Sequence, residues 1–173
     1  MILGRKAILE LMKSEDIRID PFDDSALGPA SYDVALGSKF RIFDRFDDVI
    51  DVRDNSFDPA VYGDVVDTAG EPIDVLPGQL VLGITRERIT LSNRVMGWIS
   101  GRSRFARVGI LVHVSSNLIQ PGVSNHQILE IVNLSPRPLR LHPGVRIAQV
   151  VFEEVRGVED GGVDRRYFYQ DSP

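Results

Sequence analysis

Apolar side chains occupy alternate positions in most of the chain beyond its first 13 residues, and Pro-Gly turns interrupt this repeat. A repeat of two places successive side chains on opposite faces of an extended strand, whereas a helix needs a repeat near 3.6. Many short strands at close spacing indicate an all-β fold, a β-sandwich or barrel with Greek-key connections. The predicted strands cover residues 40–43, 79–84, 95–99, 110–114, 128–132, 139–141 and 146–152, with turns at Pro77-Gly78, Pro121-Gly122 and Pro143-Gly144.

Three segments depart from the alternation. Residues 4–13 carry apolar side chains at helical spacing and predict a short amphipathic helix. Residues 44–74 are acidic and irregular, and we expect a surface excursion with one or two edge strands. Residues 157–173 are polar and Gly-rich but contain three adjacent aromatic residues, so we expect this tail to dock on its own subunit or on a neighbour.

Composition excludes several classes of site. The chain has 173 residues, of which 43% are hydrophobic, and this is enough for one domain with a substantial core. It contains no cysteine, so disulfides, thiol nucleophiles and thiolate zinc sites are absent, and its three histidines lack metal-ligand spacing. We therefore expect no zinc and no metal site on the chain.

The net charge and the length of the apolar runs limit the kinds of partner that this chain can bind. The net charge of −5 argues against a general nucleic-acid binder but allows a local basic cluster that holds a nucleotide-sized anion. No apolar run is long enough to span a bilayer, and the N-terminus lacks the features of a signal peptide. The expectation is a cytoplasmic protein with neither nucleic acid nor membrane as partner.

A basic turn follows the predicted strand at 95–99. It reads Gly101-Arg102-Ser103-Arg104-Phe105-Ala106-Arg107. A glycine followed by a serine at a helix start presents free backbone N–H groups and a hydroxyl, and arginines add bidentate donors for phosphate. The same residues also fit a solvated basic turn in which Ser103 caps the helix. Phosphate binding and the solvated turn both remain open from spacing alone.

Glu130 is a single carboxylate within an apolar strand. If Leu129 and Ile131 face the core, Glu130 and Ile128 point across the sheet, into a groove or a subunit contact. Arg107 is a plausible partner, and a carboxylate held by an arginine in a water-poor pocket can act as a general base. An ordinary solvent-facing glutamate fits the same pattern.

His113 lies within the predicted strand at 110–114. Its position between two valines favours a hydrogen-bonded core or interface histidine over a catalytic one. A nucleophilic triad is not expected, because the chain has no strained nucleophile motif such as G-x-S-x-G.

Ordered motifs along the chain resemble the dCTP deaminase family, a branch of the trimeric dUTPase fold. They are G-R-S-x-x-A-R-x-G-[IL]-x-V-H from residue 101, then P-G, L-E-I-x-N, and P-L-x-L-x-P-G-x-x-I-x-Q-x-x-F. Residues 29–37 match the N-terminal signature of that family, and Arg166-Tyr167-x-x-Gln170 matches its C-terminal K-Y-x-x-Q. The matches run in order from about residue 2 to residue 170.

The resemblance implies a distorted β-barrel or jelly-roll of the dUTPase-like type with one or two short helices, in a single domain over residues 1–173. It implies a homotrimer with active sites at subunit interfaces, and a tail, residues 157–173, that closes over the nucleotide. The implied activity is hydrolytic deamination of dCTP to dUTP and ammonia, supplying dUTP for thymidylate synthesis. Mg²⁺ would be carried with the triphosphate, and dTTP would be a candidate inhibitor.

Site residues are carried over by position. Glu130 matches the general acid/base at C4 of cytosine, Arg107 the arginine beside it, and Ser103 a serine that positions water and phosphates. Arg102, Ser103, Arg104, Phe105, Ala106 and Arg107 match the phosphate-binding segment; Ile128, Leu129 and Glu130 match the strand edge that reads the base; and Arg166, Tyr167 and Gln170 match the tail. A metal-free, carboxylate-based deaminase also agrees with the absence of cysteine, which zinc deaminases require.

The chain departs from the family pattern near the sugar. Gln120 stands where the family commonly has an aspartate that meets the deoxyribose 3′-hydroxyl and activates water in dUTP-hydrolysing relatives. Gln120 can bond to a hydroxyl but cannot act as a base. Val123 and Asn125 replace an aromatic residue and a glycine, and asparagine tolerates the left-handed backbone expected at a glycine. Ser116 replaces an alanine beside the attacking water.

Two further departures concern the phosphates. Arg104 replaces a second serine, which changes the phosphate contacts, and the tail is shorter than is typical, which affects closure. The leading interpretation is a dCTP deaminase. The alternatives are a dUTP diphosphatase, alone or as a second activity, and a non-catalytic trimeric nucleotide-binding regulator on the same fold.

Overall fold

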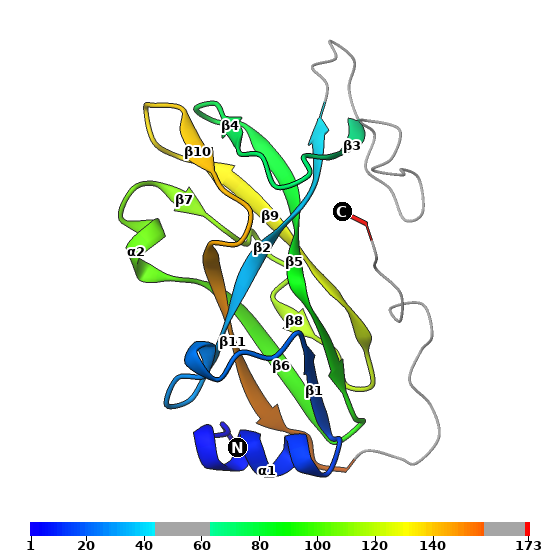
Figure 1. Ribbon diagram of the computed structural model, residues 1–173. Coiled ribbons are helices and arrows are strands. Elements are labelled where there is room, and N and C mark those ends of the chain that lie inside the picture. Colours follow the sequence, from blue (N-terminus) through cyan, green and yellow to red (C-terminus); the bar gives the residue numbers. More distant parts are fainter. Residues whose placement is uncertain (44–62, 158–171) are drawn as a thin grey trace.

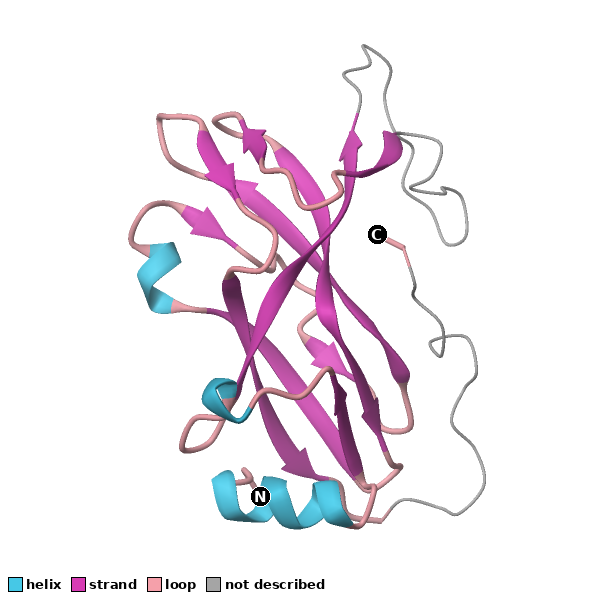
Figure 2. Ribbon diagram, in the orientation of Figure 1, coloured by secondary structure: helices cyan, strands magenta, loops and turns pink. Residues whose placement is uncertain are grey.

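One strongly curled antiparallel sheet forms most of the molecule, and two short helices lie at its periphery (Figures 1 and 2). The computed structural model describes residues 1–43, 63–157 and 172–173. The helices are α1 (Arg5–Lys13) and α2 (Ser103–Ala106), with a 3-10 turn, η1 (Asp24–Ala26). The strands are β1 (Ile17–Asp20), β2 (Tyr32–Phe43), β3 (Gly63–Asp67), β4 (Ile73–Val75), β5 (Leu80–Leu91), β6 (Val95–Gly101), β7 (Ile110–Leu111), β8 (Leu118–Ile119), β9 (Ser124–Asn133), β10 (Leu139–Leu141) and β11 (Arg146–Glu154).

The main sheet has the order β7-β9-β5-β2-β11-β6-β8, with β1 added on β5 and β3 added on β2. A separate pair, β10 and β4, completes the described strands. Residues 112–117 connect β7 and β8, which are the two ends of the main sheet. The curl therefore brings the ends of the sheet toward each other, as in the distorted β-barrel that the sequence predicts.

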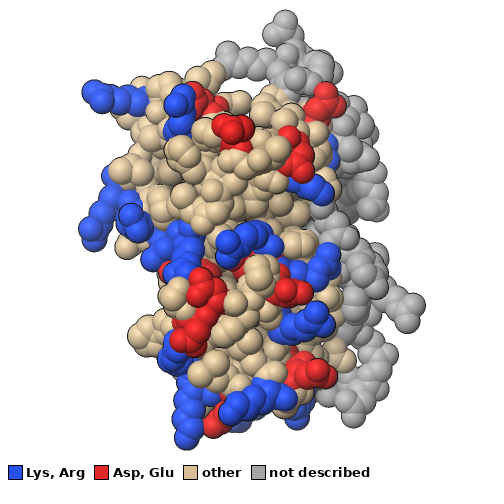
Figure 3. Space-filling model, in the orientation of Figure 1, with Lys and Arg blue, Asp and Glu red and all other residues tan. Residues whose placement is uncertain are grey.

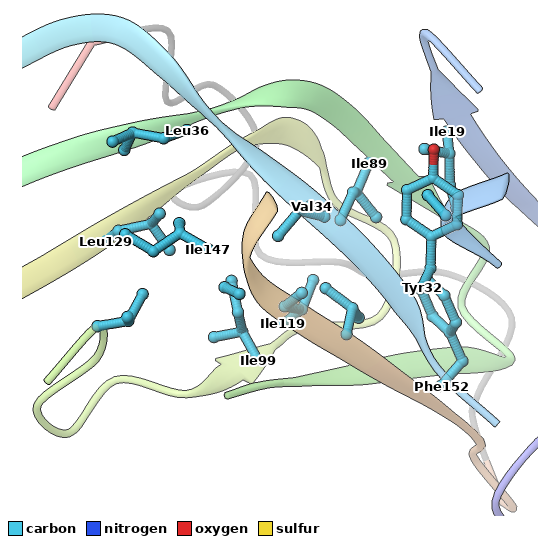
Figure 4. Close-up of a cluster of buried hydrophobic side chains, with 14 of the residues drawn as sticks. Ile19, Tyr32, Val34, Leu36, Ile89, Ile99, Ile119, Leu129, Ile147 and Phe152 are labelled. Carbon is cyan, nitrogen blue, oxygen red and sulfur yellow. The ribbon is translucent and has the colours of Figure 1, made fainter. Parts of the chain in front are cut away.

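The core fills the inside of this curl. Its side chains come from β1, β2, β5, β6, β8, β9 and β11 (Figure 4). Tyr32, Phe40 and Phe152 are the largest residues that are fully buried. Ile8 of α1 is also fully buried, so α1 covers one end of the sheet, as its amphipathic pattern predicts.

Every strand predicted from the alternation is present, although several bounds differ. The strand predicted over 79–84 extends to Leu91, because Thr85 and Glu87 occupy inward positions with only 1% of their surface exposed. Glu87 is tolerated there because its carboxylate accepts hydrogen bonds from the Ala35 N–H (2.8 Å) and the Arg86 guanidinium (3.0 Å). The strand predicted over 110–114 ends at Leu111, and the N–H groups of Val114 and Ser115 bond to the side chain of Glu130 instead of to a neighbouring strand.

The excursion and the tail are described only in part. Of the predicted excursion, the described residues contain β3, at the side of β2, and β4, paired with β10, in agreement with the expected edge strands. The remainder of the excursion lies outside the described residues. Arg166, Tyr167 and Gln170 of the predicted tail also lie outside them.

Candidate active site

A cavity of about 390 Å³ lies between the edge of β9 and the segment 113–120 that leads into and out of β8. The cavity has the predicted site residues Ser116, Gln120, Ile128 and Glu130 in its lining. These residues come from two segments that are separate in the sequence. The fold thus brings together residues that the sequence predicts to read the base and to perform the chemistry.

The edge of β9 that faces the cavity is open. β7 pairs with β9 only at Asn133 and Val132, so no described strand covers β9 before Val132 on this side. The Gln127 N–H donates to Thr85 Oγ1 and the Asn133 N–H to the Gln79 carbonyl, so odd-numbered residues of β9 bond toward β5. Because backbone groups alternate along a strand, the N–H and C=O of Ile128 and Glu130 point to the open edge.

Two backbone amides hold the carboxylate of Glu130. Its Oε2 accepts hydrogen bonds from the N–H groups of Val114 (2.9 Å) and Ser115 (3.0 Å). Leu129 and Ile131, on either side, are buried, so Glu130 points across the sheet as the alternation predicts. The carboxylate is therefore oriented by the segment after β7, with Oε1 left without a partner among the described residues.

The predicted ion pair between Glu130 and Arg107 is not formed between the described residues of one protomer. Arg107 follows α2 and is exposed, and neither cavity described here includes it in its lining. A second cavity of about 320 Å³ adjoins the first at Ile99 and His113 and reaches α2 only at Ala106. The turn that holds Arg107 is thus separated from the carboxylate by the segment 112–117.

The other residues of the basic turn have different surroundings. Arg102 is half-buried and forms an ion pair with Asp33 (3.0 Å) and a hydrogen bond to the Arg146 carbonyl (2.9 Å). Ser103 and Arg104 are exposed, and the Arg104 guanidinium lies over the ring of Phe105, which packs against the core. Ser103 and Arg104 are therefore accessible to an anion, while Arg102 holds the turn against the sheet.

The predicted residue Leu129 lies in the core, fully buried, with its side chain on the face opposite to Glu130. It is not part of the lining of the cavity. The alternation of β9 explains this position, because Leu129 shares the inward face with Ile131.

His113 lies in the walls of both cavities. Both ring nitrogens are buried and accept or donate no hydrogen bond in the part of the chain that the structure describes. The expectation of a hydrogen-bonded histidine is therefore not met within one protomer. Leaving a polar group buried without a partner carries a free-energy cost.

Two residues that the sequence did not assign to the site, Asn125 and Gln127, also line the first cavity. They are buried on the inward face of β9, and Gln127 Nε2 donates to Asn125 Oδ1 (2.5 Å). Asn125 lies within the strand and does not have the left-handed backbone expected for it. The sequence could have pointed to these residues, because a polar side chain at the inward position of an alternating strand is unusual.

Acidic and basic side chains are interspersed over the face shown in Figure 3. Several charged side chains of the described residues are paired, such as Arg5 with Asp24 and Arg146 with Asp23. Among the described residues, no group of three His, Asp or Glu side chains is arranged to hold a metal ion. Neither described helix has the length and apolar character needed to cross a membrane.

Known proteins match this chain over most of its length. The family model described as dCTP deaminase-like matches residues 2–155. The dCTP deaminase, dUMP-forming, of Mycolicibacterium gilvum is 37% identical over 155 residues, which is 87% of this chain and 78% of that protein. The dCTP deaminase of a Marinomonas species is 33% identical over 174 residues, which is 96% of this chain and 90% of that protein.

Solved structures agree in fold. The 2′-deoxycytidine 5′-triphosphate deaminase from Agrobacterium tumefaciens superposes with a TM-score of 0.65 at 24% identity, over 87% of this chain. The match spans 47% of that protein, so this chain has about half its length. A dUTPase from phage phi11 of S. aureus, 12% identical, superposes with a TM-score of 0.51 over 86% of this chain and 96% of its own. The family match and the relatives above 30% identity show that this chain belongs to the dCTP deaminase-like family of enzymes, on the fold that it has in common with dUTPases.

Proposed function

We propose that this protein deaminates dCTP by hydrolysis, with Glu130 as the general acid and base. The observation that carries the proposal is the carboxylate of Glu130, oriented by two backbone amides beside an open strand edge in a cavity. The family and the two named relatives support the same activity.

The open edge of β9 is suited to recognise a base. The N–H and C=O of Ile128 point to this edge and supply one donor and one acceptor side by side. Cytosine offers the complementary pair, acceptors on the ring and a donor on its exocyclic amine. Main-chain recognition at Ile128 would place C4 of the ring beside Glu130, two residues further along the strand.

The reaction then uses a single carboxylate. Glu130 takes a proton from water while the water oxygen bonds to C4, and it delivers this proton to the ring nitrogen N3. A second proton passes from the new hydroxyl to the exocyclic amine, the C4–N bond breaks, ammonia leaves and the C4 carbonyl forms. The balance is dCTP and water to dUTP and ammonia, with no redox step.

We propose that the triphosphate binds to the basic turn of a neighbouring subunit, in a homotrimer. Ser103 and Arg104 on α2, and Arg107 directly after it, are exposed, and none of the three lines either of the two cavities of their own protomer. Exposed apolar side chains lie close to the cavity, on the segment from β7 to β8 and on β6, as a subunit contact requires: Trp98, Leu111, Val114 and Leu118. Mg²⁺ would arrive on the triphosphate oxygens, and the tail with Arg166, Tyr167 and Gln170 would cover them.

The product is proposed to be dUTP. Glu130 is the only carboxylate in the described lining of the cavity, and Gln120 cannot activate a second water for diphosphate release. The alternative product is dUMP, which the name of the Mycolicibacterium gilvum relative favours. A dUMP-forming enzyme would also have to activate a water for release of the diphosphate, and the described lining offers no second carboxylate for this step.

The test is incubation of the protein with dCTP and Mg²⁺, with the loss of cytosine absorbance, ammonia and the nucleotide products measured together. We expect dUTP and ammonia in equal amounts, without pyrophosphate. Glu130→Gln should lower the rate by about 10²–10⁴-fold, whereas Glu71→Gln, at an exposed turn, should not. Pyrophosphate with dUMP would support the second product, and nucleotide binding without any turnover would favour a regulator and contradict the proposal.

A further inference from the structure

The inner end of the cavity contains two carboxamide side chains on neighbouring inward positions of β9. Asn125 and Gln127 have 4% and 9% of their surface exposed, and both line the cavity together with the apolar residues Ile99, Ile119 and Val123. Polar side chains at such positions need partners, because an inward position of a strand is normally apolar.

The hydrogen bonding of the Gln127 carboxamide is incomplete without a ligand. Gln127 Nε2 donates to Asn125 Oδ1, but Gln127 Oε1 accepts no hydrogen bond within the described part of the chain. Oε1 is not fully buried, and because Gln127 lines the cavity, this oxygen is in contact with open space. An acceptor and the second amide hydrogen of Gln127 are thus available to a ligand.

The fold determines which part of a nucleotide reaches these groups. With C4 beside Glu130, the base cannot extend toward Val132, because β7 covers that end of the edge. It must extend along β9 toward Ile128, and the sugar then lies beyond it, near residues 125–127 and Gln120. Two residues of a strand span about 6–7 Å, which is close to the size of a pyrimidine ring with its glycosidic bond.

This end of the cavity has the chemistry to hold a ribose. A carboxamide both donates and accepts, as does a sugar hydroxyl, so the match does not depend on which way the amide of Gln127 is turned. No Phe, Tyr or Trp is present in the described lining to fill the space at C2′. A purely apolar wall would leave a 2′-hydroxyl without a partner, whereas Gln127 provides one.

We propose that Gln127, supported by Asn125, binds the 2′-hydroxyl of a ribonucleotide, so that this enzyme accepts CTP as a substrate as well as dCTP. The inference rests on the proposed deamination and extends it to a second class of sugar. Gln127 is a specificity-determining residue in this proposal and takes no part in the proton transfers.

The experiment compares kcat/KM for CTP and for dCTP on the wild type, Gln127→Met and Gln149→Leu. The wild-type values should lie within about tenfold of each other. Gln127→Met keeps the length of the side chain, and the ratio of CTP to dCTP should fall about tenfold or more because the hydroxyl loses its partner. Gln149 bonds to Ser31 and is not in the lining of the cavity, so its variant should keep the wild-type ratio.

The outcomes separate this inference from the proposed function. Turnover of dCTP with CTP more than about 100-fold slower overturns the inference and leaves the deaminase intact. Equal losses for both nucleotides in Gln127→Met give Gln127 a structural role only and also overturn it. Calorimetry with Glu130→Gln adds a readout that does not need turnover. Equal affinity for CTP and dCTP supports the contact between Gln127 and the 2′-hydroxyl even if deamination fails, whereas binding of neither nucleotide overturns both the inference and the proposed function. The wild-type comparison stands if Gln127→Met does not fold.

Discussion

Arg107 and Glu130 do not meet within one protomer, and subunit mixing can show whether they meet in the assembly. Arg107 is exposed after α2 and has no ion pair among the described residues, while the amides of Val114 and Ser115 hold Glu130. If both residues serve one active site, Arg107 must come from a neighbouring subunit. Glu130→Gln and Arg107→Ala should then each be inactive alone but restore activity when they assemble together.

The expected recovery follows from counting. In a cyclic trimer assembled at random from equal amounts of the two variants, each site takes Glu130 from one subunit and Arg107 from the next. The chance that both are intact is one half multiplied by one half, so about a quarter of the wild-type activity should return. If both residues came from the same subunit, every site would carry one defect and no activity would return.

The assay is deamination of dCTP by the two variants co-expressed with different tags and purified through both tags in succession. This selection removes pure trimers of one variant, which raises the recovery to about a third, since two intact pairs then occur among six possible sites in the two mixed arrangements. Arg137→Ala, which removes an exposed arginine that lines neither cavity, serves in place of Arg107→Ala as the control for altered surface charge. Mixed trimers that remain as inactive as the single variants would refute the shared site.

Three further predictions concern stability and are measured by urea denaturation. Glu130→Ala should lower the free energy of unfolding by about 1–3 kcal/mol because two amides lose a charged acceptor, and Glu130→Gln by about half as much; equal losses would contradict this. The hydrogen bond from the Ser14 hydroxyl is the main factor that lowers the pKa of Asp16 in the folded state. The ionised Asp16 carboxylate therefore stabilises the fold fully above about pH 4, and this stabilisation is lost as the pH falls through the folded pKa. Asp16→Asn should be less stable than the wild type at pH 6, with a smaller difference in the free energy of unfolding at pH 3. Gly109 and Gly144 have similar positive φ values of +88° and +85°, but a Cβ on Gly109 would lie 2.8 Å from a backbone nitrogen, whereas Gly144 faces open space. Gly144→Ala should therefore lower the free energy of unfolding by about 1 kcal/mol, and Gly109→Ala should lower it by more. Similar losses for the two variants would show that the clash at Gly109 is relieved.

The alternation of apolar residues was sufficient to predict the sheet and the orientation of Glu130. β9 shows why, since Leu129 and Ile131 on its inward face are buried and Glu130 is not. The strand over 79–84 was predicted too short, because Glu87 interrupts the apolar pattern and its partner, the Ala35 N–H, is far away in the sequence. Local patterns cannot show that a distant amide will satisfy a buried carboxylate.

The site was predictable only in part for the same reason. Ser116, Gln120, Ile128 and Glu130 were assigned through ordered motifs, and they do line one cavity. Gln127 was missed, because its contact with the cavity depends on how far the sheet curls and where its last strand ends. These are properties of pairing between distant segments.

The early end of β7 and the open edge of β9 have one physical cause in Glu130. Residues 110–114 read as a strand, and continuing the register of Ile110 with Asn133 would place His113 opposite Glu130 and close the edge. Instead the N–H groups of Val114 and Ser115 bond to the side chain of Glu130, which directs this segment away from the backbone of β9. Unpaired strand edges readily accept another strand, so a carboxylate that occupies the donors of the competing segment keeps this edge open, as the proposed recognition of a base requires. The residue proposed to carry the chemistry thus also maintains the opening in which the chemistry takes place.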